Sequence, residues 1–63
     1  MEVKTPKGHI IKIKGTDAGI NVFWYNDLAV GSLHHSDCVL SKIDMQLQSC
    51  DRVIESLKAW EIK

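Results

Sequence analysis

A stripe of apolar residues in the second half constrains this chain most. From residue 40 onward apolar side chains recur in alternating steps of three and four, which is the spacing of one face of an amphipathic α-helix. Ser36 or Asp37 can cap the start, and no Gly or Pro follows. The pattern predicts one long helix over residues 36–62. The stripe comprises Leu40, Ile43, Leu47, Cys50, Ile54 and Leu57, widened along one flank by Val39, Val53 and Trp60.

Part of this region has a second interpretation. Ile43, Met45 and Leu47 alternate with polar residues, which is the period of a half-buried strand. Residues 42–48 would then form a fifth strand, and a shorter helix would begin near Asp51. The long helix places Asp51 among the residues of its polar side. It is favoured because it leaves only one large apolar residue, Met45, on that side, a smaller violation than abandoning the whole stripe.

The first half of the chain predicts strands, because it is rich in β-branched and aromatic residues. Thr5-Pro6-Lys7-Gly8 is typical of a turn, and Asn26-Asp27 tolerates the left-handed conformations of a tight hairpin. Short connections pair sequential strands. The expected fold is α+β, an antiparallel β-meander of three to four strands followed by one long C-terminal amphipathic helix packed on one sheet face. We expect a single domain over residues 1–63, with the meander in 1–33.

Length, charge and cysteine spacing bear on the class of protein. The 63 residues carry eight Lys plus Arg and eight Asp plus Glu, so bulk charge cannot drive polyanion binding. So short a chain leaves little room for substrate and cofactor lobes, and we expect no enzyme and no cofactor. Cys38 and Cys50 would lie about 18 Å apart along a helix, too far for a disulfide. Free thiols, without a signal-peptide or membrane-spanning pattern, predict a cytoplasmic protein and no membrane partner.

The sizes of the predicted elements favour self-association. A helix from Asp37 to Trp60 would run about 35 Å, beyond strands of about 20 Å. One helix covers one sheet face, so the other face, holding Ile10, Phe23 and Tyr25, would expose an apolar patch. Trp24 is assigned to the core, since large aromatic side chains dominate burial in small domains. We expect a small non-catalytic protein-protein interaction module (regulator, inhibitor or adaptor) that forms a homodimer and contacts an unidentified protein; a monomer tolerating exposed apolar surface is the simpler alternative. The expected contacts are Ile10, Phe23, Tyr25, Leu57 and Trp60, with Leu47 and Ile54 if helices pair.

A nucleic-acid-binding module is the alternative function. Residues 1–14 carry four lysines against Glu2, so charge is polarised along a neutral chain. If the face holding Lys4, Lys12 and Lys14 also shows Phe23 and Tyr25, it forms a stacking platform beside cations, as single-strand binders use. The register between strands is not readable from the sequence, and solvated lysines are the simpler interpretation.

The densest polar cluster is the pentapeptide His34-His35-Ser36-Asp37-Cys38. Its histidines and thiol are zinc-ligand types, and a thiol in the first turn of a helix ionises readily, so a metal-binding or thiol-dependent protein is a second alternative. A structural zinc site needs four ligands, and His9 and Cys50 are the only reserves. Consecutive residues point in different directions, which argues against a triad. We therefore expect a polar strand-to-helix junction, with no catalytic, cofactor-binding or metal-binding residue.

Overall fold

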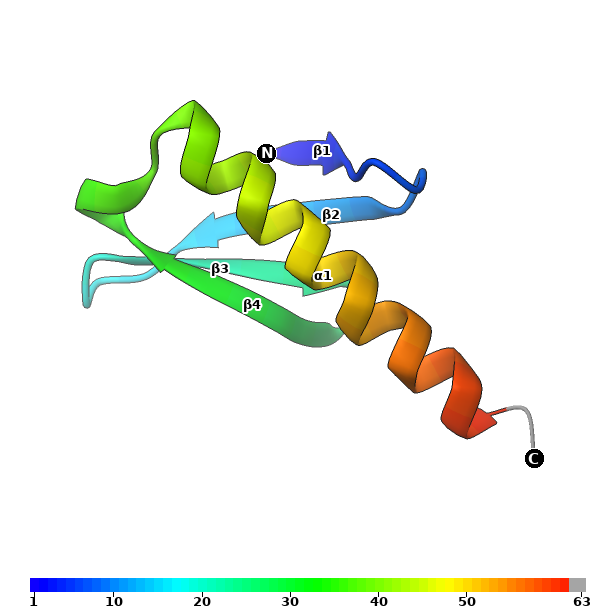
Figure 1. The fold of residues 1–63 in the computed structure, drawn as a ribbon. Helices are drawn as coiled ribbons and strands as arrows, with labels where there is room; N and C mark the ends of the chain where they lie inside the picture. The colour runs from blue at the N-terminus through cyan, green and yellow to red at the C-terminus, as the bar shows by residue number, and fades with distance from the viewer. Residues whose placement is uncertain (62–63) are drawn as a thin grey trace.

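The computed structural model describes residues 1–61 and contains one sheet and one long helix. Strands β1 (Glu2–Lys4), β2 (Ile10–Gly15), β3 (Ile20–Tyr25) and β4 (Leu28–His34) form an antiparallel sheet in the order β1-β2-β3-β4. A short 3-10 helix, η1 (His35–Asp37), leads into α1 (Leu40–Glu61), which crosses one face of the sheet (Figure 1). The predicted α+β fold, a meander followed by one long helix, is confirmed.

Both predicted turns join neighbouring strands. In the β1–β2 turn, the Gly8 N–H donates to the Thr5 carbonyl at 2.9 Å, and Gly8 adopts φ 89°. In the β3–β4 turn, Asn26 adopts φ 55°, a left-handed conformation that Asn tolerates better than most residues. The two-residue turn places Tyr25 opposite Leu28. Local turn chemistry therefore fixes where each hairpin closes.

The helix begins later than predicted. Residues 35–37 form η1, and the His34 ring Nδ1 accepts from the Ser36 N–H at 3.3 Å, so His34 caps this turn in place of Ser36 or Asp37. The α-helix starts at Leu40, and residue 62, the predicted end, lies outside the described residues. Residues 42–48 are helical, so the alternative of a fifth strand was wrong. No helix within residues 1–61 is both long and apolar enough to cross a membrane.

The core lies between α1 and the sheet face beneath it. Ile13 pairs with Phe23 across β2 and β3, and both point toward the helix. On β4, Gly31 allows close approach, because a Cβ there would overlap the side-chain amide of Gln46. The helix therefore sits directly against the edge strand. The buried cluster contains Ile11, Ile13, Phe23 and Val30 from the sheet, and Leu47, Cys50 and Ile54 from α1.

The β1–β2 turn is tied to the helix by a polar clamp. The Lys7 backbone N–H donates to Asp51 Oδ2 at 3.1 Å, and the Lys7 ammonium donates to Glu55 Oε1 at 2.6 Å. Asp51 is only 3% exposed, whereas the helical pattern predicted it on the polar side. It is buried because the turn closes over it, a contact 44 residues distant in sequence.

Candidate functional site

The pairing register decides which side chains share the sheet face that α1 leaves uncovered. Lys12 pairs with Trp24, and Lys14 pairs with Val22. Directly paired residues point to the same side of a sheet, so these four side chains lie together, opposite the buried Ile13 and Phe23. We call this side the open face. It comprises Glu2, Lys4, Ile10, Lys12, Lys14, Ile20, Val22, Trp24, Ala29, Ser32 and His34.

The open face combines cations with an aromatic ring. Lys4, Lys12 and Lys14 are exposed, Trp24 is half-buried, and Glu2 is the acidic residue of the face. Among the described residues, no ion pair engages any of these three lysines. A hollow of about 180 Å³ lies between Lys12, Lys14, Trp24 and the β3–β4 turn residues Asn26 and Asp27. The arrangement can attract an anion and stack a planar group.

The aromatic residues predicted beside these lysines lie on the other side of the sheet. Phe23 is fully buried beneath α1, so the expectation of an uncovered face holding Phe23 was wrong. Tyr25 points the same way as Phe23 and packs against the core, and its ring contacts His9 edge-on at 5.5 Å between centroids. The reason is the register: Phe23 faces Ile13, and the alternation of β3 then sends Trp24 to the lysines.

A second exposed surface lies where α1 projects past the sheet. The 22 residues of α1 span about 33 Å, whereas strands of six or seven residues, such as β3 and β4, span about 20 Å. The C-terminal turns of α1 therefore extend beyond the β3–β4 hairpin (Figure 1). Val53, Leu57 and Trp60 share one flank of α1 by their spacing. We call this flank, with the hairpin residues beside it, the overhang surface. Its members are Tyr25, Leu28, Val53, Leu57 and Trp60.

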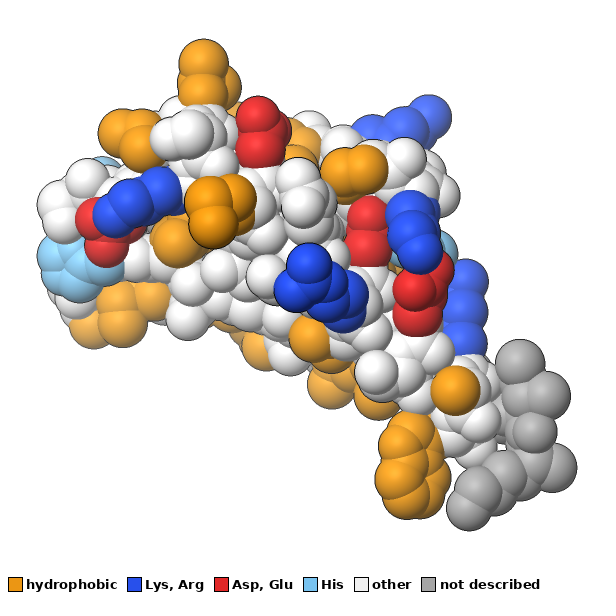
Figure 2. Space-filling view, viewed as in Figure 1, with side chains coloured by type: hydrophobic (Ala, Val, Ile, Leu, Met, Phe, Trp, Pro, Cys, Tyr) orange, Lys and Arg blue, Asp and Glu red, His pale blue; other side chains and the backbone are white. Residues whose placement is uncertain are grey.

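The overhang surface is apolar and hollowed. Leu28 is 47% exposed, Val53 39% and Trp60 72%, and hydrophobic side chains gather beneath the C-terminal half of α1 and at its end (Figure 2). A hollow of about 360 Å³ is lined by Tyr25, Leu28 and Leu57, with Asp27 and Lys58 at the same opening. The exposed Trp60 thus lies about one helical turn beyond Leu57, which lines the hollow.

The residues predicted to contact a partner lie in three different places: the core, the open face and the overhang surface. Leu47 and Ile54 are buried in the chain's own core, so the expectation that they pair with another helix was wrong, as it was for Phe23. Ile10, at 49% exposure, lies on the open face. Tyr25, Leu57 and Trp60 belong to the overhang surface.

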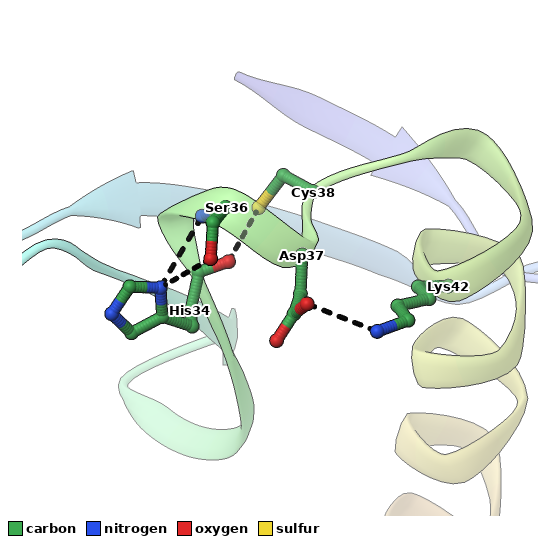
Figure 3. A network of polar contacts seen from close by, with 5 residues as sticks. All are labelled: His34, Ser36, Asp37, Cys38 and Lys42. Atoms are coloured by element: carbon green, nitrogen blue, oxygen red, sulfur yellow. Dashed lines mark hydrogen bonds and ion pairs between the residues drawn. The ribbon is translucent and has the colours of Figure 1, made fainter.

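The His34–Cys38 cluster forms a hydrogen-bonded junction between β4 and α1 (Figure 3). The His34 Nδ1 lies 2.8 Å from Ser36 Oγ, and the Cys38 thiol donates to the His34 carbonyl at 3.6 Å. The Cys38 sulfur also accepts from the Asn21 side-chain amide at 2.8 Å. Among the described residues, no three His, Cys, Asp or Glu side chains are grouped to hold a metal ion. These contacts close the junction locally.

Asp37 turns away from His34 and toward the helix. Its Oδ1 accepts from the Lys42 ammonium at 2.9 Å (Figure 3). The hydrogen bond and the charge of Lys42 lower the pKa of the Asp37 carboxyl below its usual value. The cluster therefore does not assemble a Ser-His-Asp relay, because the carboxylate is engaged elsewhere.

Two residues of these surfaces were missed in the sequence. Trp24 was assigned to the core, because alternation along the strand separates it from Phe23 but does not show which of the two faces the helix covers. Leu28 carried no separate signal, since its exposure depends on where α1 leaves the sheet.

No known protein-family model, curated protein sequence or solved structure matches this chain.

Proposed function

We propose that this chain is a small non-catalytic protein-protein interaction module, a regulator, inhibitor or adaptor that works as a homodimer in the cytoplasm. The observation that carries the proposal is the projecting end of α1, where Trp60 is 72% exposed about one helical turn beyond Leu57, a residue that lines a surface hollow. A second copy of the chain covers this overhang surface. Both cysteines are free, which suits a reducing compartment.

The overhang surface is complementary to itself. In a two-fold interface the same patch serves both partners, so the Trp60 indole of each copy faces the hollow formed by Tyr25, Leu28 and Leu57 of the other. Asp27 and Lys58 carry opposite charges and both line the hollow, so an arrangement that sets Asp27 of one copy against Lys58 of the other pairs unlike charges twice across the interface. Trp is also the residue type most enriched among strong interface contacts.

The size of the chain supports the same assignment. Among the described residues the core contains seven buried apolar side chains, and chains of this length usually need a disulfide, a metal or a partner subunit for stability. A specific interface requires roughly 800 Å² per partner, less than a fifth of the 4577 Å² that this chain exposes. The surface of the chain is therefore large enough for such an interface, and the interface would bury apolar surface that the small core leaves exposed.

Sedimentation equilibrium at tens of micromolar tests the proposal. The wild-type chain is expected to be a dimer, and Trp60→Glu should weaken dimerisation at least about 30-fold, because a central Trp contributes about 2 kcal/mol or more. Leu28→Glu, on the neighbouring hairpin, should act in the same direction.

Leu40→Glu is the matched control, since Leu40 is 83% exposed at the opposite end of α1. It should leave the subunit count unchanged. A wild-type chain that stays monomeric at high micromolar concentration would contradict the proposal, as would a control that dissociates the dimer as strongly as Trp60→Glu.

A further inference from the structure

We propose that the open face binds single-stranded nucleic acid, with a base stacked on Trp24 and phosphates contacted by Lys4, Lys12 and Lys14. This activity is separate from dimerisation, because the open face and α1 lie on opposite sides of the sheet (Figure 1). The proposal follows from the observed register, which placed an aromatic ring that was not expected there among the lysines.

Trp24 occupies a central position for stacking. It lies on β3, an inner strand, and its row across the sheet contains Lys12 on β2 and Ala29 on β4. The small Ala29 leaves one side of the indole uncrowded, while Ile10 and Val22 on adjoining rows extend the apolar floor. Stacking on an aromatic side chain tolerates any base, since every base has a π-face.

The lysines are placed to follow a phosphate backbone. Lys12 and Lys14 project from the same face of β2 about 7 Å apart. On β1, Lys4 lies opposite Ile10 and therefore diagonal to Lys12, while Glu2 lies directly opposite Lys12. These three differ from Lys7 and Lys42, whose ammonium groups pair with Glu55 and Asp37. Cations without an acidic partner among the described residues are available to neutralise phosphates.

The charges of the open face favour a polyanion over a second copy of the chain. A two-fold contact between open faces would set lysines against lysines, and like charges across an interface are unfavourable. An unpaired strand also suits the face better than a duplex, because stacking on Trp24 requires a base that is not already stacked within a helix. Asn26 also lines the hollow of about 180 Å³ beside Trp24, and its side-chain amide can meet a base edge.

Fluorescence anisotropy with a labelled oligodeoxythymidylate of about 15 nucleotides tests the site. Binding should weaken with salt with a log–log slope near −2 if three lysines contact phosphates, and Lys12→Glu should reduce that slope by about 0.7. Arg52→Glu, the same change of charge on an exposed position of α1, is the matched control and should leave the slope unaltered. Equal losses in both variants would overturn the site, because bulk charge alone would then explain binding.

Stacking has its own measurement. Trp24→Val keeps a strand-forming residue but removes the ring, and should weaken binding about 5- to 100-fold, whereas Trp24→Tyr should retain most of it. In the Trp60→Phe variant Trp24 is the sole tryptophan, and the oligonucleotide should quench its fluorescence.

Three further outcomes would also overturn the proposal: a duplex of equal length that binds as tightly, phosphatidylserine vesicles that bind more tightly than the oligonucleotide, or absence of quenching at saturation. None of these bears on dimerisation, which is measured without nucleic acid. Failure of one proposal therefore leaves the other standing.

Discussion

The two faces of one sheet have opposite chemistry, although adjacent residues of the same strand supply them. On β3, Phe23 is fully buried beneath α1, while Trp24, the next residue, lies on the open face among lysines. The covered face joins apolar side chains to the helix, and the open face keeps its cations in solvent. The comparison teaches that the position of the helix decides which face of the sheet is buried and which face keeps its side chains in solvent.

The sharpest test of this comparison replaces each of the two aromatic residues in turn. Phe23→Ala should cost about 3–5 kcal/mol, comparable to the whole free energy of unfolding of a chain this short, about 3–9 kcal/mol. Trp24→Ala should cost about 1 kcal/mol, since it loses only cross-strand contacts. Urea denaturation followed by circular dichroism measures both variants, and equal losses would break the distinction between the faces.

A second test asks whether the covered face is held by apolar burial alone. Asp51→Ala removes the acceptor of the Lys7 N–H and should destabilise the fold by about 1–3 kcal/mol, because a hydrogen bond to a buried charged group is lost. Glu55→Gln, which alters the exposed half of the same clamp, should cost less than about 1 kcal/mol. Thermal unfolding distinguishes them, and a Glu55→Gln loss as large as that of Asp51→Ala would be inconsistent with this ranking.

The smallest effect on stability is expected at the junction between β4 and α1, where Asp37 pairs with Lys42. The pKa of Asp37 is lowered by Lys42, so the ionised carboxylate stabilises the folded chain at neutral pH. This contribution is fully present above the unfolded pKa of about 3.8 and is lost as pH falls through the lower, folded value. Unfolding measured from pH 6 to pH 2 in wild type and Asp37→Asn should show a slightly shallower acid dependence in the variant. Identical profiles would remove the pair from the stability of the junction.

Much of the fold was predictable because its signals are local. The alternating steps of the apolar stripe predicted α1, and Asn26-Asp27 and Thr5–Gly8 predicted the turns that close the hairpins. The first residue of the stripe, Leu40, is nevertheless 83% exposed. Whether Leu40 is buried depends on where α1 meets the sheet, and the helix contacts the buried cluster only from Ile43 onward.

The candidate surfaces were less predictable because they depend on contacts distant in sequence. The lysines of the open face were identified, but their aromatic neighbour was misassigned, since strand register decides between Phe23 and Trp24. Asp51 was predicted on the polar side of α1, and its burial follows from a turn near the other end of the chain. Spacing along one element cannot reveal such partners.

Gly31 affects how closely α1 lies against the sheet, and hence where the end of the helix projects. The helix rests against β4 where this residue lacks a side chain, and a single methyl group there would meet the amide of Gln46. To make room for that methyl group, either the Gln46 side chain must change conformation or the helix must move away from β4. The direction in which α1 projects past the sheet, and hence the position of Trp60, depends on how closely the helix approaches β4 at Gly31.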